Sequence, residues 1–237
     1  MTGRNGMSNE TALIVGVGSG LSASLARRCA ARGMDLHLAA RNTDKLRQLA
    51  VETQATLHAC DASDPGQVAA LFESLDAAVP APAFVVYNAS YRTRGPFTGL
   101  DPEEVRKTLM VACYGGFLVG QAAARRMLDA GKGTIAFTGA SASVKGYKQS
   151  APFAMAKFGL RGLAQSMARE LAPQIIHVAH FVIDGGIEQE DDPRKEARGM
   201  DGLLHPDAIA DTYLHIHDQP RSAWTWEVEL RPWVETF

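Results

Sequence analysis

A glycine-rich turn near the start of the chain has the composition of a phosphate-binding site. Residues 16–21 are Gly-Val-Gly-Ser-Gly-Leu, between the apolar run Thr11–Val15 and a helical segment through Arg32. Glycines permit a tight turn and let backbone N–H groups approach a pyrophosphate at a helix N-terminus. Ordinary turns also use glycine, but between a strand and a helix this run predicts a dinucleotide site. The expected contacts are Gly16, Gly18, Ser19, Gly20 and Leu21.

The end of the second predicted strand indicates which dinucleotide is bound. An NAD site normally has an acid here that binds the ribose 2′-OH, whereas this chain has Ala39-Ala40-Arg41-Asn42. Without the acid, nothing repels a 2′-phosphate, and Arg41 can pair with that phosphate through its planar fork. The sequence therefore favours NADP over NAD, with Arg41 and Asn42 as contacts. The alternative is that Arg41 is a solvated surface arginine.

Other polar clusters are weaker indications of chemistry. His205, His215 and His217 suggest a metal site, but residues i and i+2 diverge on a helix, so no metal is expected. Ser22 and Ser24 are predicted helix residues without a histidine or an acid nearby in the sequence. A hydrolase triad is therefore not indicated.

The elements that must position these residues alternate between short apolar β-type runs and helical segments. This alternation predicts βαβ units, and so an α/β fold with a Rossmann-like, doubly wound, mostly parallel sheet of about seven strands and helices on both faces. No repeat or linker interrupts the chain, which predicts a single domain over residues 1–237. The predicted strands are Thr11–Val15, Leu36–Ala39, Thr56–Ala59, Phe84–Tyr87, Thr134–Thr138, His177–Ile183 and Thr225–Leu230.

Local signals refine this pattern. Asp64-Pro65 and Asp101-Pro102 each place a capping acid before a proline at the first helical position, and Glu104 is placed to complete a capping box. The charge-dense segment Glu188–Arg198 is expected to be a mobile surface loop. An apolar stripe with helical spacing indicates a core or subunit contact and consists of Leu160, Leu163, Met167 and Leu171.

The overall composition is that of a soluble globular protein. The chain has 237 residues, of which 46% are hydrophobic and 21% charged, and its net charge of −2 gives no reason to expect a nucleic-acid partner. No apolar run is long enough for a membrane span. The polar residues 1–9 are expected to form a flexible leader without a secretory signal. Scattered cysteines at 29, 60 and 113 indicate buried thiols in a reducing compartment, so a cytoplasmic location is expected.

Four further motifs follow predicted strands or open a helix. They are Cys60-Asp61-Ala62, Tyr87-Asn88-Ala89-Ser90, Phe153–Lys157 with Gly159-Leu160, and Asp184-Gly185-Gly186-Ile187. Together with the glycine turn, they resemble the short-chain dehydrogenase/reductase family over nearly the whole chain. The resemblance implies an adenine contact at Asp61, cofactor contacts through Ala62 and Asn88-Ala89-Ser90, and nicotinamide contacts through Gly185, Gly186 and Ile187. The turn itself departs from the family pattern, with Val15 for threonine and Ser22 for the last glycine.

The departure is larger at the catalytic positions. Family enzymes transfer a hydride between nicotinamide and a carbonyl or alcohol, and a tyrosine activated by a lysine supplies the proton. The tyrosine position is Phe153 here, whereas the lysine is retained as Lys157. The family's serine position is Ala140, and its asparagine position is Ala112. The chain is thus identified as a divergent member with phenylalanine in place of the catalytic tyrosine.

Two functions remain open from the sequence. A missing general acid costs about 10²–10⁴-fold in rate, which weakens carbonyl reduction without excluding hydride transfer. The first function is an NADP-dependent oxidoreductase acting on an unknown small organic substrate, with Lys157, Ser141 and Tyr147 as candidate catalytic residues. Alternatively, Ser141 belongs to a small-residue loop and Tyr147 is a surface aromatic. The second function is a catalytically silent NADP-binding sensor, scaffold or partner subunit.

The resemblance also implies a homodimer or homotetramer. Its expected contacts are the helices that contain Met110–Met127 and Lys157–Leu171. Small residues in these helices permit close packing, namely Gly115, Gly116, Gly120, Gly159 and Gly162. The tryptophan-rich segment Arg221–Phe237 is a candidate for closing a pocket.

Overall fold

The computed structural model describes residues 10–236, whose core is a seven-stranded parallel sheet. Its strand order is β3-β2-β1-β4-β5-β6-β7, so the chain changes direction across the sheet between β1 and β4. Such a reversal opens a crevice beyond the carboxyl ends of the strands, where α/β proteins bind ligands. The strands are β1 (Thr11–Val15), β2 (Asp35–Ala40), β3 (Thr56–Ala59), β4 (Phe84–Tyr87), β5 (Gly133–Thr138), β6 (Ile176–Ile183) and β7 (Glu227–Leu230).

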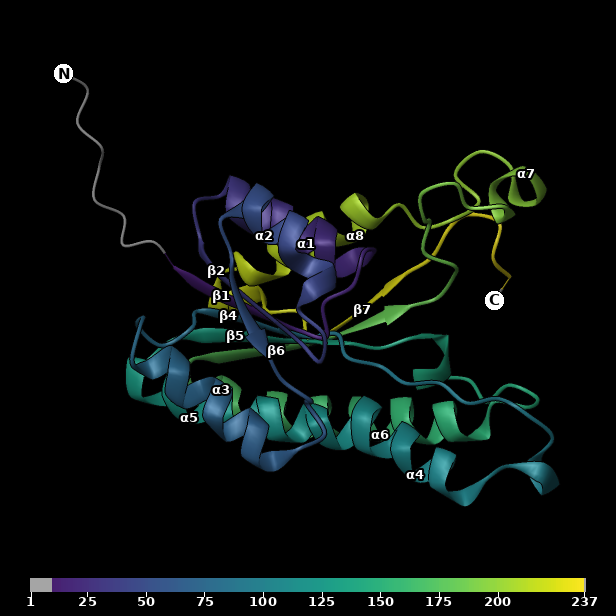
Figure 1. The fold of residues 1–237 in the computed structure, drawn as a ribbon, viewed down its shortest axis with the longest axis horizontal. Helices are drawn as coiled ribbons and strands as arrows, with labels where there is room; N and C mark the ends of the chain where they lie inside the picture. Colours follow the sequence, from purple (N-terminus) through teal and green to yellow (C-terminus); the bar gives the residue numbers. More distant parts are fainter. Residues whose placement is uncertain (1–9, 237) are drawn as a thin grey trace.

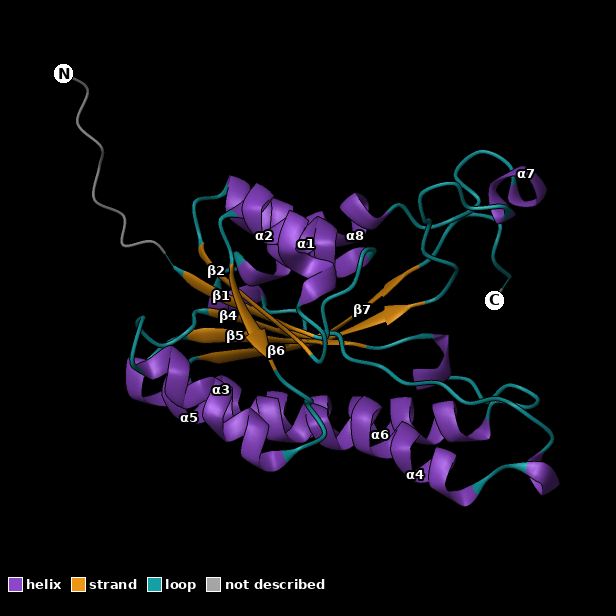
Figure 2. Ribbon diagram, in the orientation of Figure 1, coloured by secondary structure: helices purple, strands orange, loops and turns teal. Residues whose placement is uncertain are grey.

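Helices cover both faces of this sheet, as Figures 1 and 2 show. One face carries α1 (Leu21–Ala31), α2 (Arg47–Thr53) and α8 (Pro206–His217). The other face carries α3 (Pro65–Asp76), α4 (Pro102–Leu109), α5 (Gly115–Ala130) and α6 (Ala151–Leu171). The short helix α7 (Arg194–Arg198) lies apart from both layers, near the end of the described chain. This is the predicted doubly wound α/β fold.

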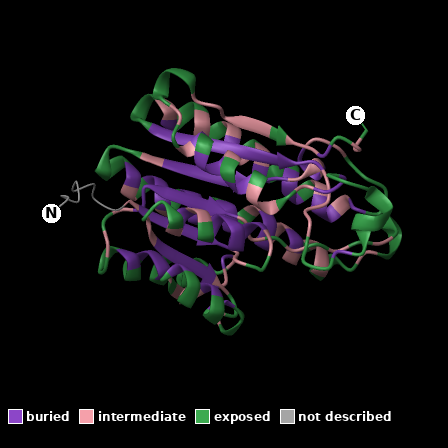
Figure 3. Ribbon diagram, turned by 90° about the horizontal axis from the view of Figure 1, so that it is seen from above, coloured by how far each residue is buried: buried purple, intermediate pink, exposed green. Residues whose placement is uncertain are grey.

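Burial on both faces explains why the strands are apolar throughout rather than alternating. Every residue of β1, β4 and β6 is buried, and Figure 3 shows the buried sheet between helices whose outer faces are exposed. Separate apolar cores fill the two sides of the sheet. In the predicted stripe on α6, Leu160 and Leu171 belong to one of these cores, and Leu163 and Met167 pack against it. The stripe is therefore core.

The predicted caps are confirmed at two helix starts. The Asp64 carboxylate accepts a hydrogen bond from the Gln67 N–H at 3.0 Å, and Asp101 accepts one from the Glu103 N–H at 3.0 Å. The capping box through Glu104 is wrong. That carboxylate accepts a hydrogen bond from the Tyr91 hydroxyl instead, because the loop after β4 lies within its reach.

The segment Glu188–Arg198, expected to be a mobile surface loop, is mostly exposed but partly helical. It contains α7, and its charges pair within the segment rather than facing solvent alone. Arg194 binds the buried Asp192 at 2.6 Å, and Lys195 binds Glu188 at 2.7 Å. The prediction of a loop is therefore corrected at residues 194–198, and the mobility of the segment stays a prediction. The predicted leader, residues 1–9, lies outside the described residues.

No helix between residues 10 and 236 has the length and apolar character to cross a membrane.

Candidate functional site

The glycine turn after β1 is held against the end of β4. Gly16 has φ +88°, and a Cβ atom there would lie 2.2 Å from the Ala89 nitrogen, so only glycine fits. The Ser22 hydroxyl donates to the Gly16 carbonyl at 3.2 Å, and the Asn88 amide donates to the Ser22 oxygen at 2.6 Å. Serine at the last position of the turn therefore joins two predicted site segments, the glycine turn and the Asn88 motif. Gly20 precedes the first residue of α1, which places the helix N-terminus at the turn.

A cavity of about 260 Å³ opens beside this turn, at the carboxyl ends of β1, β2, β3 and β4. It is large enough to admit part of a nucleotide, and the switch point of the sheet is where such a ligand is expected. The structure thus brings together most of the residues predicted on the adenine side. The predicted residues that line it are Gly16, Gly18, Arg41, Asp61, Ala62, Asn88, Ala89 and Ser90. Residues of the lining that the sequence did not single out are Val17, Ala40 and Val111.

Charges in the cavity are arranged for a polar ligand. Arg41 is exposed at the end of β2 and has no ion pair among residues 10–236. Partial burial alone would raise the pKa of Asp61, but hydrogen bonds from Ser63 and the nearby charge of Arg41 hold it below its usual value. The carboxylate thus stays ionised and able to accept hydrogen bonds from a ligand.

Other predicted cofactor residues lie outside this cavity. Asn42 accepts a hydrogen bond from the Asp44 N–H at 3.0 Å and so stabilises a local turn. Leu21 is buried in the core under α1. Ser19 and Gly20 stand at the helix start without lining the cavity.

Lys157 and Phe153 lie one helical turn apart at the start of α6, and both are buried. The Lys157 ammonium donates to the Thr138 carbonyl at 2.7 Å and lies 5.7 Å from the centre of the Phe153 ring. Burial lowers the pKa of Lys157 to about 8, and Cys113 opposes this only in part. Because no hydroxyl stands at position 153, the lysine is the titratable group that remains at the predicted proton-donor position.

A second cation lies against Phe153. The guanidinium carbon of Arg92 lies 4.8 Å from the ring centre, a stacking distance for arginine on an aromatic face. Sequence reasoning did not identify Arg92, because it belongs to the irregular loop after β4 and meets α6 only in the folded chain. The one available signal was a pair of arginines, Arg92 and Arg94, beside the Asn88-Ala89-Ser90 motif.

The segment after β5, which contains Ser141 and Ser143, takes part in a buried network of hydrogen bonds. The Ala140 N–H donates to the Ser143 hydroxyl at 3.1 Å, and that hydroxyl lies 3.4 Å from His180 Nε2. His180 Nδ1 lies 3.1 Å from a Glu227 oxygen, and Arg161 binds the same carboxylate through two hydrogen bonds of 2.6 and 2.7 Å. Ser143 and His180 are fully buried. The network therefore positions the backbone and does not present a nucleophile.

The other two predicted hydroxyls sit nearer solvent. Ser141 is half-buried in a single turn, Ser141–Ser143, and Tyr147 is 44% exposed on the loop that follows. Neither side chain has a hydrogen bond to another residue between 10 and 236. Both lie on the loop segment that leads from β5 into α6.

The position of the family's asparagine is unusual in its backbone. Residues Met110–Tyr114 form one turn of π-helix between α4 and α5, and Ala112 within it is fully buried. The Tyr87 hydroxyl donates to the Val111 carbonyl at 2.5 Å inside this turn. Such π-turns often occur at functional sites, but here the side chain is a methyl group with no hydrogen-bonding capacity.

The segment Asp184–Ile187 after β6 contacts the C-terminal part of the chain. Asp184 is buried and binds Lys145 at 3.2 Å and Arg231 at 2.9 Å. A Cβ atom on Gly185 would lie 2.6 Å from Pro232, and one on Gly186 would lie 2.7 Å from the Arg194 guanidinium. The expectation that Arg221–Phe237 closes over this edge therefore has a structural basis at Arg231 and Pro232.

The histidines have packing roles. His217 stacks on Phe84 at 4.7 Å and shares a hydrogen bond with Thr134, and His177 stacks on Trp224. Within the described part of the chain, no group of three or more metal-ligating side chains forms.

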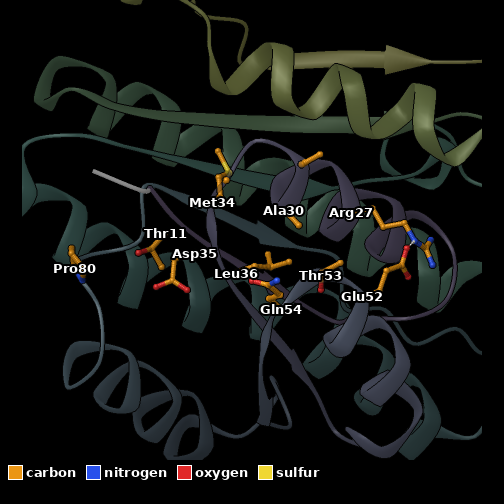
Figure 4. A pocket seen from close by; sticks show the side chains of 12 residues that line it. Thr11, Arg27, Ala30, Met34, Asp35, Leu36, Glu52, Thr53, Gln54 and Pro80 are labelled. Atoms are coloured by element: carbon orange, nitrogen blue, oxygen red, sulfur yellow. Dashed lines mark hydrogen bonds and ion pairs between the residues drawn. The ribbon is translucent and has the colours of Figure 1, made fainter. Parts of the chain in front are cut away.

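A larger cavity lies at the opposite end of the sheet (Figure 4). It is lined by the first residues of β1 and β2, Thr11 and Asp35, and by the ion pair between Arg27 and Glu52 at 2.7 Å. None of the predicted site residues reaches it. Size alone therefore does not identify the functional end of this molecule.

Comparison with known proteins agrees with the geometry. A sequence model of the short chain dehydrogenase family matches residues 10–190. The chain is 33% identical over 187 residues to a trans-4-hydroxycyclohexanecarboxylate dehydrogenase of Sinomonas cyclohexanicum, covering 73% of this chain and 70% of that protein.

Two solved structures have the same fold over nearly their whole length. The first is a short-chain dehydrogenase from Rhodopseudomonas palustris, with 37% identity, a TM-score of 0.82, and coverage of 96% of this chain and 100% of that one. The second is a metagenomic short-chain oxidoreductase in complex with NADP, with 28% identity, a TM-score of 0.83, and coverage of 95% and 98%. On the matched sequence and the shared parallel sheet, this chain belongs to the short-chain dehydrogenase/reductase family.

Proposed function

We propose that the protein is an NADP-dependent oxidoreductase that acts on a small organic carbonyl compound or the corresponding alcohol. The observation that carries this proposal is the cavity beside the glycine turn, with Arg41 and no acid at the end of β2. When bound, NADPH supplies a hydride to the carbonyl carbon, the oxygen gains a proton, and the products are NADP⁺ and an alcohol. A structural relative that binds NADP supports this choice of cofactor.

Different residues of the chain would bind different parts of the cofactor. The turn at Gly16 and the N-terminus of α1 would hold the pyrophosphate, and Arg41 the 2′-phosphate. Asp61 would contact the adenine. Lys157 would hydrogen-bond the nicotinamide ribose, which fits its place at the start of α6.

Lys157 is also our candidate for the group that holds the reaction's proton. An ammonium whose pKa is about 8 remains protonated at neutral pH yet releases its proton more readily than an ordinary lysine. Ser141 and Tyr147, on the adjoining loop, would carry that proton to the substrate oxygen. With these roles, a proton reaches the substrate although position 153 has no phenol.

Cofactor preference is tested by titrating NADPH and NADH against wild-type protein and Arg41→Ala. A lost charge-assisted contact should weaken NADPH binding by about 10–150-fold, while NADH binding changes little. Arg47→Ala is the matched control, because Arg47 is an exposed arginine paired with Asp44 at 2.6 Å. Equal wild-type affinities for the two cofactors would overturn the NADP assignment.

The second candidate is a silent NADP-binding protein acting as a sensor, scaffold or partner subunit. Phe153, Ala140 and Ala112 favour it, because together they remove three polar side chains from the reaction site. Turnover separates the two functions: NADPH consumption is followed with a panel of aldehydes, ketones and oxo acids. Retained NADPH affinity without turnover of any of them would favour the silent protein.

We also propose a homo-oligomer that packs through the outer sides of α5 and α6. Exposed apolar side chains gather on this stretch of the fold, namely Tyr114, Phe117, Met155 and Phe158. Two of the glycines predicted at the contact also serve packing within the chain, whereas Gly162 is exposed and nothing lies within 4 Å of a Cβ added there. A Cβ on Gly116 would lie 2.6 Å from Leu160, and one on Gly159 would lie 2.8 Å from Cys113. Light scattering on wild type and Phe158→Glu tests the assembly, which should dissociate in the variant.

A further inference from the structure

The two segments that meet around Phe153 carry positive charges and no acid. Residues 88–96 include Arg92 and Arg94, and residues 139–157 include Lys148 and Lys157, while neither segment contains aspartate or glutamate. A further lysine of the second segment, Lys145, is paired with Asp184. A hydrogen bond from the Gly95 N–H to the Gln149 carbonyl at 3.2 Å joins the two segments. Positive charge concentrated at one site raises the local concentration of anions.

Arg92 is the cation best placed to bind an anion directly. Its guanidinium carbon lies over the Phe153 ring, 4.8 Å from the ring centre. The Lys157 ammonium nitrogen lies 5.7 Å from the same centre. Stacking on the ring face fixes the plane of the guanidinium and leaves its edge N–H groups free to bind a carboxylate in two-point fashion.

No residue between 10 and 236 uses those N–H groups. Elsewhere in the same structure, arginines bind carboxylates closely: Arg161 binds Glu227 at 2.6 and 2.7 Å, and Arg126 binds Asp76 at 2.5 and 2.7 Å. Partial burial and the like charge of Arg94 lower the pKa of Arg92, so its surroundings do not compensate its charge. An incoming anion would relieve that cost.

We propose that the substrate at this site is an organic carboxylate, an oxo acid or the corresponding hydroxy acid, whose carboxylate is bound by Arg92. The proposal rests on the proposed oxidoreductase function and adds the substrate class to it. With the carboxylate on Arg92, the reacting carbon would lie beside the Phe153 ring, against which Lys157 also lies. A phenylalanine at this position then has a purpose: it is the flat surface that orients the anion-binding guanidinium.

The first measurement is binding, which does not depend on turnover. Cyclohexanecarboxylate and cyclohexanecarboxamide, which differ only in charge, are titrated calorimetrically into the full chain saturated with NADP⁺. We expect the carboxylate to bind about 10-fold or more tightly than the amide. Arg92→Gln should abolish this preference, and Arg92→Lys should restore part of it, because lysine keeps the charge but lacks the fork. Arg169→Gln is the control: it removes an exposed arginine 16 residues beyond Phe153 on the same helix, about 24 Å along its axis.

The second measurement is turnover of 4-oxocyclohexanecarboxylate and its methyl ester with NADPH. We expect kcat/KM to favour the acid by about 10-fold or more in wild type and in Arg169→Gln, and to be equal for the two compounds in Arg92→Gln. Thermal melting of each variant verifies folding. Equal binding of carboxylate and amide by the wild type, or no binding of either, would overturn the proposal.

Two outcomes separate this inference from the proposed function and from a cofactor role for Arg92. If Arg92→Gln weakens NADPH binding by about 10-fold and leaves the carboxylate preference intact, the guanidinium serves the cofactor's phosphates and the inference is wrong. If carboxylate binding depends on Arg92 but no compound is turned over, the anion site stands and the oxidoreductase proposal fails.

Discussion

The carboxyl ends of β1 to β4 and the carboxyl ends of β5 and β6 face the same crevice but differ in how they are built. The first region depends on backbone: a glycine at φ +88°, a helix N-terminus, and a strand end close enough to exclude any side chain. The second depends on side chains, and the sequence predicts that Phe153 and Ala140 stand there at the positions of the family's tyrosine and serine. Backbone geometry tolerates few substitutions, whereas a site made of side chains changes with single residues, so substitutions are expected to affect the two regions differently.

Several buried or half-buried polar contacts lie in and beside the second region. Asp184 binds Lys145 and Arg231, and the His180–Glu227–Arg161 contacts join the middle of β6 and of α6 to the start of β7. Burial lowers the pKa of His180 to about 4, although Glu227 opposes this shift, so the histidine is neutral at physiological pH. These contacts stabilise the folded region.

The largest effect should come from the backbone-built region. Gly16→Ala forces a Cβ atom against the Ala89 backbone and a strained φ, which should lower the free energy of unfolding by about 3–5 kcal/mol and remove cofactor binding. Gly33→Ala is the matched control, because its φ is +76° but no atom lies within 4 Å of the added Cβ. It should cost only about 1–2 kcal/mol. Urea denaturation measures both, and equal losses would show that the close approach to Ala89 is unimportant.

The next largest effect should come from Lys157, the buried lysine of α6. The unfolded chain keeps the Lys157 proton up to a pH of about 10.5, whereas the folded chain, with a pKa of about 8, releases it earlier. Between these values the folded state binds fewer protons, so the free energy of unfolding rises with pH. Relative to Lys157→Met, wild-type stability should increase by about 3 kcal/mol from pH 8 to 10.5.

Lys148→Met, which removes an exposed lysine nearby, should show no such rise when it is compared with wild type. Guanidinium denaturation at several pH values checks both variants. A flat difference between wild type and Lys157→Met would mean that the buried amine keeps its proton in the folded chain.

Phe153→Tyr tests whether the side-chain region can be reversed. The new phenol would stand four residues before Lys157 and beside Arg92, and both cations should lower its pKa toward a working value. We expect turnover of carbonyl substrates with NADPH to rise by about 10-fold. Phe158→Tyr, an exposed ring on the same helix, is the control. No gain at retained NADPH affinity would mean that Ala140 and Ala112 also prevent the reaction.

The smallest effect on stability should come from Ser22, whose side chain is hydrogen-bonded to the glycine turn. Ser22→Ala removes the hydrogen bonds to the Gly16 carbonyl and to Asn88, at a cost of about 1 kcal/mol in unfolding free energy. Ser166→Ala, an exposed serine on α6, should change stability less. Thermal melts compare the two, and an unchanged Ser22→Ala protein would mean that the turn needs only its glycines.

The sequence by itself determined the alternation of strands and helices, the seven strand positions to within two residues, and the placement of the glycine turn at the first helix. These features are local: apolar runs, glycines and capping acids act within a few residues, so their pattern is visible along the chain. It also predicts that Phe153 stands at the position of the family's tyrosine.

Only the tertiary structure decided what surrounds that phenylalanine. Arg92 is 61 residues before Phe153 in the chain, and no periodicity links the two. The same holds for Ser143, His180 and Glu227, whose contact depends on the pairing of β5, β6 and β7. The helical stripe was open between core and interface until packing placed it in the core. Long-range contacts depend on how whole elements pack, and short patterns in the sequence do not encode them one residue at a time.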